Sequence, residues 1–139
     1  TQEWPLRPSY GGGTMEDQEQ GTKSRVVKVD SMESWDFHVN QATLQGCPIV
    51  AHFTAVWCIP SVAMNPFMEE LASMYQNMSF LTIDVDDVKE VASKYEVKAM
   101  PTFLLLKAGV PVDKIVGANP DELKKRIHTL AQSNPTDIP

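Results

Sequence analysis

Hydrophobic residues of this chain fall into short runs rich in Val, Ile and Phe, separated by longer stretches with polar positions between the apolar ones. Strand-like runs lie at residues 26–29, 48–54 and 79–85. Helical stretches lie at residues 31–46, 60–76 and 88–95. Ser31 can cap the first helix and Gly46 can end it, whereas Pro66 should kink the second. Asp86 or Asp87 is available to cap the third helix.

The pattern changes after residue 101. Strands are predicted at 102–107 and 110–116, and Ala108-Gly109 between them is a hairpin signal. Asn119 can cap a last helix, with Pro120 at its first position and Glu122 closing a capping box. Alternating strands and helices followed by a hairpin predict an α/β fold. We expect a mixed central sheet of about five strands flanked by four helices.

The domain organisation follows from where this pattern begins and ends. Residues 1–23 show no hydrophobic period and include three consecutive glycines, so we interpret them as a flexible tail. Within it, residues 1–14 could be a cloning remnant, with Met15 as the natural start. Residues 24–133 are expected to form one domain, and 134–139 a polar, proline-containing tail.

Charge and cysteine content exclude several functions. The net charge of −6 argues against nucleic acid and anionic membrane partners, which reward Lys and Arg. No apolar run could span a bilayer, and no secretory signal opens the chain. Two cysteines, Cys47 and Cys58, exclude a disulfide scaffold and fit a reducing compartment, so we expect a cytoplasmic protein. The scattered histidines and cysteines lack metal-ligand spacing, so no metal site is expected.

Cys58 is the candidate nucleophile. It follows a buried strand and precedes a helix that Pro60 can open, where unpaired N–H groups and the helix dipole favour a thiolate. Ser61 can add a hydrogen bond to the same sulfur. The alternative is an inert, buried cysteine. An extended strand separates Cys47 from Cys58, too far for an internal disulfide.

Two segments carry a family resemblance. Residues 53–61 (FTAVWCIPS) resemble the active-site motif of plant h-type thioredoxins, and residues 100–103 (MPTF) resemble their cis-proline motif. Further positions match at compatible spacing: Pro66, residues 84–86, Gly109 and residues 116–118. The chain is most similar to the plant CXXS-type (monothiol) thioredoxin-like proteins. The resemblance implies the thioredoxin fold, and a family described as poor disulfide reductases but competent disulfide isomerases.

Four residues depart from the dithiol pattern. Ser61 replaces the resolving cysteine, and Ile59 replaces the usual glycine. His52 stands in place of a buried aspartate, and Thr82 in place of its accompanying lysine. Because an engineered serine would explain Ser61 alone, we interpret the chain as a natural monothiol protein. His52 is either a neutral base for proton transfer near Ser61 or a packed core histidine.

A lone thiolate defines the expected chemistry. Cys58 can attack a substrate disulfide, but Ser61 cannot resolve the mixed disulfide, so an external thiol must do so. We therefore expect thiol–disulfide exchange with isomerase character and weak reductase activity. The alternatives are a glutathione-dependent monothiol oxidoreductase and a non-catalytic binding module. The residues expected to contact substrate are Trp57, Ile59, Pro60, Met100, Pro101 and Ala118.

The expected partners follow from this chemistry. They are proteins with disulfides or thiols, with glutathione as an external thiol in place of a bound cofactor. No nucleic acid or membrane partner is expected, and the protein is expected to be a monomer.

Overall fold

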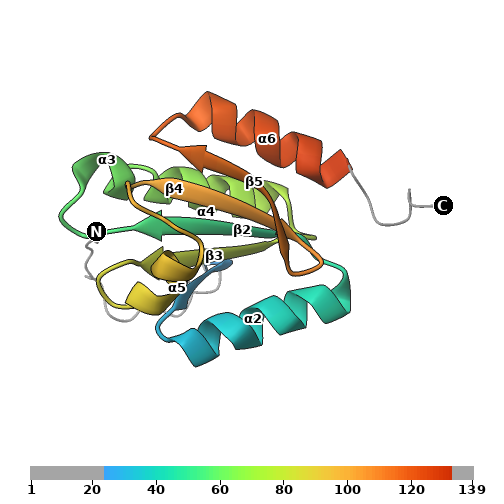
Figure 1. Ribbon diagram of the computed structural model, residues 1–139. Coiled ribbons are helices and arrows are strands. Elements are labelled where there is room, and N and C mark those ends of the chain that lie inside the picture. Colours follow the sequence, from blue (N-terminus) through green and yellow to red (C-terminus); the bar gives the residue numbers. More distant parts are fainter. Residues whose placement is uncertain (1–23, 133–139) are drawn as a thin grey trace, which may run out of the picture.

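The computed structural model describes residues 24–132 (Figure 1). The predicted tails at 1–23 and 134–139 lie outside these residues. The elements follow in the order β1 (Val26–Val29), α2 (Met32–Gln45), β2 (Ile49–Thr54), α3 (Ile59–Val62), α4 (Asn65–Met74), β3 (Ser79–Asp84), α5 (Lys89–Lys94), β4 (Thr102–Lys107), β5 (Val110–Val116) and α6 (Pro120–Gln132). Within residues 24–132, no helix is both long and apolar enough to cross a membrane.

The five strands form one mixed sheet, as the sequence predicts. Their order is β1-β3-β2-β4-β5, with β1, β3 and β2 parallel and β4 antiparallel to β2. The hairpin from β4 to β5 completes one edge. β2 lies in the middle, and all six of its residues are buried, which explains its nearly continuous apolar sequence. The chain leaves this central strand directly into the Cys58 segment.

Helices cover both faces of the sheet (Figure 1). Helices α2 and α5 pack on one face, where Trp35 contacts Phe53 and Tyr95 at ring-centroid distances of 6.2 and 5.5 Å. Helices α4 and α6 pack on the other face through Met68, Leu71, Leu123 and Ile127. Two apolar layers therefore hold the central strand from both sides.

The helix predicted over 60–76 is interrupted. Helix α3 ends at Val62, and α4 begins at Asn65, so the predicted helix consists of two segments. Pro66 lies in the first turn of α4, where its missing N–H leaves no hydrogen bond unmade, rather than at a kink inside a helix. α3 therefore has only four residues.

Two of the predicted helix starts are confirmed. The Ser31 hydroxyl accepts from the Ser34 N–H at 3.0 Å, and Gly46 ends α2 in the left-handed conformation. Asn119 Oδ1 accepts from the Glu122 N–H at 3.1 Å. The predicted aspartate cap of α5 is wrong, because Val88 occupies that position without a side-chain bond.

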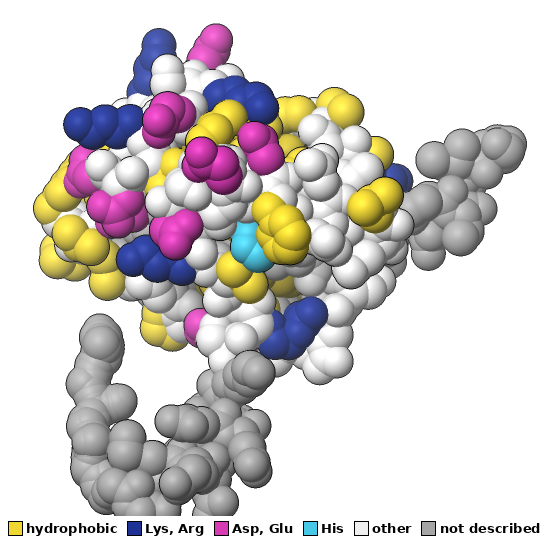
Figure 2. Space-filling view, turned by 90° about the horizontal axis from the view of Figure 1, so that it is seen from below, with side chains coloured by type: hydrophobic (Ala, Val, Ile, Leu, Met, Phe, Trp, Pro, Cys, Tyr) yellow, Lys and Arg dark blue, Asp and Glu magenta, His cyan; other side chains and the backbone are white. Residues whose placement is uncertain are grey.

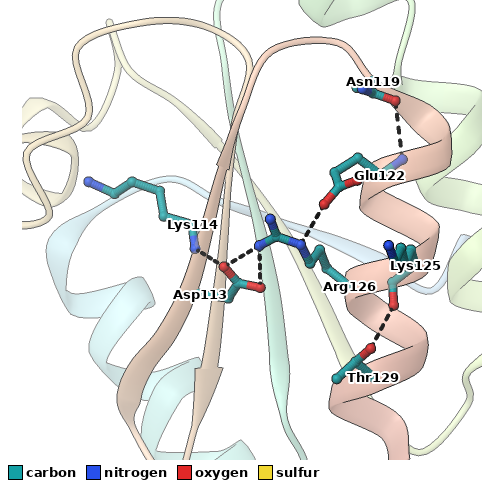
Figure 3. Close-up of polar contacts among 7 residues, drawn as sticks. All are labelled: Asp113, Lys114, Asn119, Glu122, Lys125, Arg126 and Thr129. Carbon is teal, nitrogen blue, oxygen red and sulfur yellow. Dashed lines mark hydrogen bonds and ion pairs between the residues drawn. The ribbon is translucent and has the colours of Figure 1, made fainter.

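The side chain of Glu122 contacts Arg126 instead of completing a capping box (Figure 3). Arg126 Nε donates to Glu122 at 2.6 Å, and Arg126 also pairs with Asp113 of β5 at 2.6 Å. The hydrogen bond to Asp113, followed by that to Glu122, raises the pKa of the guanidinium. These contacts connect α6 to the edge strand β5.

Candidate active site

The sulfur of Cys58 lies between two loops that are distant in the sequence. Cys58 is the N-cap residue of α3, directly after the loop that follows β2. Its partly exposed thiol donates to the Met100 carbonyl oxygen at an Sγ–O distance of 3.6 Å. The Met100–Pro101 peptide bond is cis. The fold thus brings the two segments that carry the family resemblance against each other.

The hydroxyl of Ser61 turns into the protein rather than toward this sulfur. Ser61 is completely buried, and its Oγ donates to Thr54 Oγ1 at 2.5 Å. The same oxygen lies 3.3 Å from His52 Nε2. Among the described residues no hydrogen bond joins Ser61 to Cys58, so the expected bond to the sulfur is wrong. The strand partner Thr54 was missed, although its place two residues after His52 puts both side chains on one strand face.

His52 is a buried histidine stacked on an aromatic ring. It has no exposed surface, and its imidazole lies 4.6 Å from the Phe103 ring at an interplanar angle of 14°. Burial lowers the pKa of His52 to about 4, so the ring is neutral near pH 7. Its Nδ1 has no hydrogen-bond partner within residues 24–132. This environment is that of a packed core histidine, and a proton-transfer role stays a prediction.

The polar side chains beneath the thiol contact one another. The Ser61 oxygen lies within hydrogen-bond distance of both Thr54 Oγ1 and His52 Nε2, and the tautomer of His52 decides which member of the second contact donates. Ser61, Thr54 and His52 form a buried polar cluster beneath the thiol, which we call the inner cluster.

Exposed apolar side chains surround the thiol. Trp57 and Ile59 are 61% and 74% exposed, and Val56, which the sequence analysis missed, is 78% exposed. Trp57 Nε1 donates to Asp86 Oδ2 at 2.8 Å, which fixes the indole beside the turn before α5. Large apolar groups left in water beside a reactive atom are typical of a binding surface.

The other expected substrate contacts differ in accessibility. Pro60 and Ala118 are exposed, Met100 is partly buried and Pro101 is buried. The Gly117 N–H donates to the Pro101 carbonyl at 2.9 Å, so the loop containing Ala118 lies beside the cis peptide. Pro101 is therefore buried beneath a surface at which Pro60 and Ala118 are exposed and Met100 is partly exposed.

The second cysteine lies at the opposite end of the central strand. Cys47 precedes β2, Cys58 follows it, and both are free thiols. Among the described residues, no group of three or more His, Cys, Asp or Glu side chains could hold a metal ion. Of the two free thiols, Cys58 is the one at the exposed apolar surface described above.

The fold and this site define a thioredoxin-type protein, and comparison with known proteins agrees. The thioredoxin family model matches residues 25–129, so the chain belongs to the thioredoxin family. It is 67% identical over 111 residues to "Thioredoxin-like protein CXXS1" of Arabidopsis thaliana, covering 80% of this chain and 94% of the relative. It is 56% identical over 110 residues to the protein of that name in Oryza sativa subsp. japonica, covering 79% and 83%.

Solved structures show the same similarity. The crystal structure of thioredoxin NaTrxh from Nicotiana alata matches with a TM-score of 0.73 and 42% identity, covering 76% of this chain and 92% of that one. A poplar wild-type thioredoxin h matches with a TM-score of 0.75 and 38% identity, covering 77% and 96%. The predicted resemblance is confirmed, and the chain is a thioredoxin-fold thiol–disulfide exchange protein with plant relatives.

Proposed function

We propose that this protein catalyses thiol–disulfide exchange through a mixed disulfide at Cys58, with isomerase character and weak reductase activity. The observation that supports the proposal is the pairing of a partly exposed thiol with a buried hydroxyl at position 61. The thiol can reach a substrate, and the residue that would resolve the product has no sulfur.

The first step is attack by the Cys58 thiolate on one sulfur of a substrate disulfide. A bond forms between Cys58 Sγ and that sulfur, and the other substrate sulfur leaves as a thiolate. In a dithiol protein, an internal cysteine would then attack with an effective concentration of roughly 10⁵ M or more. Ser61 offers only a hydroxyl directed at Thr54, so the mixed disulfide persists until another thiol attacks it.

The attacking thiol decides the outcome. Attack by a second cysteine of the same substrate gives a rearranged disulfide and regenerates Cys58 without net electron transfer. Attack by small external thiols instead reduces the substrate disulfide. This net reduction consumes two thiol molecules and is slow. Because rearrangement is intramolecular in the mixed disulfide, it has the higher effective concentration. Isomerisation should therefore exceed reduction.

The apolar surface supports protein substrates. Val56, Trp57 and Ile59 can contact apolar side chains of a substrate while Cys58 is bonded to it. The same surface is the observation that favours a non-catalytic binding module as the second candidate. In that case binding would survive loss of the thiol.

Scrambled ribonuclease tests the proposal. The Cys47→Ser variant should restore ribonuclease activity as the parent does, whereas Cys58→Ser should not, and insulin reduction with either protein should be slow. Recovery that is equal with and without Cys58 would contradict the proposal. Capture of scrambled ribonuclease by Cys58→Ser without any recovery would instead support the binding module. The cytoplasmic location stays a prediction that a fluorescent fusion can check.

A further inference from the structure

A polar pocket lies between the turn that follows β3 and the segment that leads to the cis peptide, and one of its residues, Asp86, contacts Trp57 of the active-site surface. It has a volume of about 610 Å³, within the range of small-molecule sites. Its lining residues come from the turn before α5, from α5 and from the segment that leads to the cis peptide: Val85, Asp86, Lys89, Ala92, Ser93, Glu96, Val97 and Lys98. The proposed mechanism does not otherwise use this pocket.

Two contacts connect this pocket to Cys58. Asp86, which lines it, accepts from Trp57, the residue directly before the cysteine. Lys98, which also lines it, precedes by two residues the Met100 whose carbonyl contacts the sulfur. The pocket is therefore linked to the Cys58 loop through the Asp86–Trp57 hydrogen bond and to the Met100 loop through the chain that continues from Lys98.

The pocket carries charges of both signs. Lys89 and Lys98 supply two cations, and Glu96 and Asp86 supply two anions. Within the described part of the chain, no hydrogen bond or ion pair engages the ammonium of Lys89 or Lys98. Figure 2, which shows the face seen from below, has acidic and basic side chains close together over part of it. Unpaired lysines beside an acidic group suit a ligand with carboxylates and an ammonium.

We propose that this pocket binds the small external thiol that releases substrates from Cys58, and that this thiol is a zwitterionic γ-glutamyl peptide, glutathione. This inference rests on the proposed function, because it concerns the second step at the same sulfur. Glutathione has two carboxylates for Lys89 and Lys98, and one ammonium for Glu96. To reach Cys58 from this pocket, its thiol has to pass Trp57, the residue that Asp86 contacts.

The step balances as an exchange. The glutathione thiolate attacks Cys58 Sγ in the mixed disulfide, a bond forms between these two sulfurs, and the substrate leaves as a thiolate that takes a proton from water. A second glutathione attacks the glutathione sulfur of this adduct, giving glutathione disulfide and the Cys58 thiolate. The two glutathione molecules supply both electrons of the net reduction.

The test measures release of a neutral leaving group from Cys58. In the Cys47→Ser protein, 2,2′-dipyridyl disulfide converts Cys58 to a thiopyridyl adduct, and attacking thiols release thiopyridone, which is followed by absorbance. The attacking thiols are glutathione and glutathione diethyl ester, which lacks both carboxylates. Their rates are corrected for intrinsic reactivity with the thiopyridyl adduct of a short cysteine peptide.

We expect the corrected rate with glutathione to exceed that with the diethyl ester about tenfold and to saturate with concentration. Lys89→Ala and Lys98→Ala should each lower the glutathione rate about threefold, as expected for charge pairs made by exposed lysines. The matched control is Lys124→Ala on α6, which removes the same charge far from the pocket and should leave the rate unchanged. The lysine effect should shrink in high salt.

Equal, non-saturating rates for glutathione and its diethyl ester would overturn the pocket proposal. Equal effects of Lys98→Ala and Lys124→Ala would overturn it as well, because they would reflect net charge alone. Failure of the proposed function has a different signature. If Cys58 forms no thiopyridyl adduct, or if Cys58→Ser restores scrambled ribonuclease as the parent does, the thiol itself is not the reactive group.

Discussion

Acidification should destabilise this protein through His52. Its pKa falls from 6.5 to about 4 on burial, so between these values the unfolded chain binds a proton that the native protein excludes. The stability that the neutral ring contributes is complete above about pH 6.5 and is lost as the pH falls toward 4. From these two values, the loss between about pH 7.5 and pH 4.5 is roughly 2 to 3 kcal/mol of unfolding free energy.

The assay is urea unfolding followed by tryptophan fluorescence at both pH values. The perturbation is His52→Leu, which removes the titrating group while keeping an apolar side chain against Phe103. We expect its unfolding free energy to fall roughly 2 to 3 kcal/mol less than that of the parent across this interval. Absolute stability also changes in this variant, because the contact with Ser61 is lost, so the comparison uses only the pH-dependent part.

The matched control is His128→Gln, because His128 is an exposed histidine on α6. It should show the pH dependence of the parent. The reasoning is refuted if His52→Leu and the parent lose the same stability on acidification. A direct check is the imidazole NMR titration of His52, which should show no protonation above about pH 5.

Two further predictions concern side chains around the site, and a third concerns the contacts between α6 and β5. Ser61→Ala should lower the unfolding free energy by about 1–3 kcal/mol, because it leaves the Thr54 hydroxyl unpaired, and urea unfolding checks this. The same variant should change the alkylation rate of Cys58 less than twofold, which iodoacetamide kinetics check. Trp57→Phe loses the bond to Asp86 and should raise proteolytic nicking of the loop at a cost in unfolding free energy of about 1 kcal/mol or less. Arg126→Leu should lower the melting temperature at low salt more than at high salt, and an equal loss at both would contradict an electrostatic role.

The order of strands and helices was predictable because each kind of element has its own sequence pattern. Apolar β-branched runs become buried strands, and side-chain caps such as Ser31 and Asn119 mark helix starts. The interruption between α3 and α4 was not predictable from periodicity. The apolar positions continue through it, and Pro66 is compatible both with a kink and with a new first turn.

The approach of the two loops at Cys58 was predictable only through the family resemblance. No local pattern relates Met100 to a cysteine 42 residues earlier. The direction of the Ser61 hydroxyl was beyond both kinds of reasoning. It depends on which polar groups strand β2 offers, and Thr54 Oγ1 lies closer to the Ser61 oxygen than His52 Nε2 does.

Because the Ser61 hydroxyl points inward, the residues around the thiol fall into two groups with different functions. The inner cluster brings the Ser61 oxygen within hydrogen-bond distance of Thr54 Oγ1 and His52 Nε2 and joins α3 to β2, so changes there should alter stability first. On the surface side, the sulfur is close to the Met100 carbonyl and to exposed apolar side chains. Changes to these groups should alter the thiol–disulfide exchange activity first. A Ser61 variant that kept its stability but lost exchange activity would show that the hydroxyl turns toward Cys58 during the reaction. It would place Ser61 among the reacting groups.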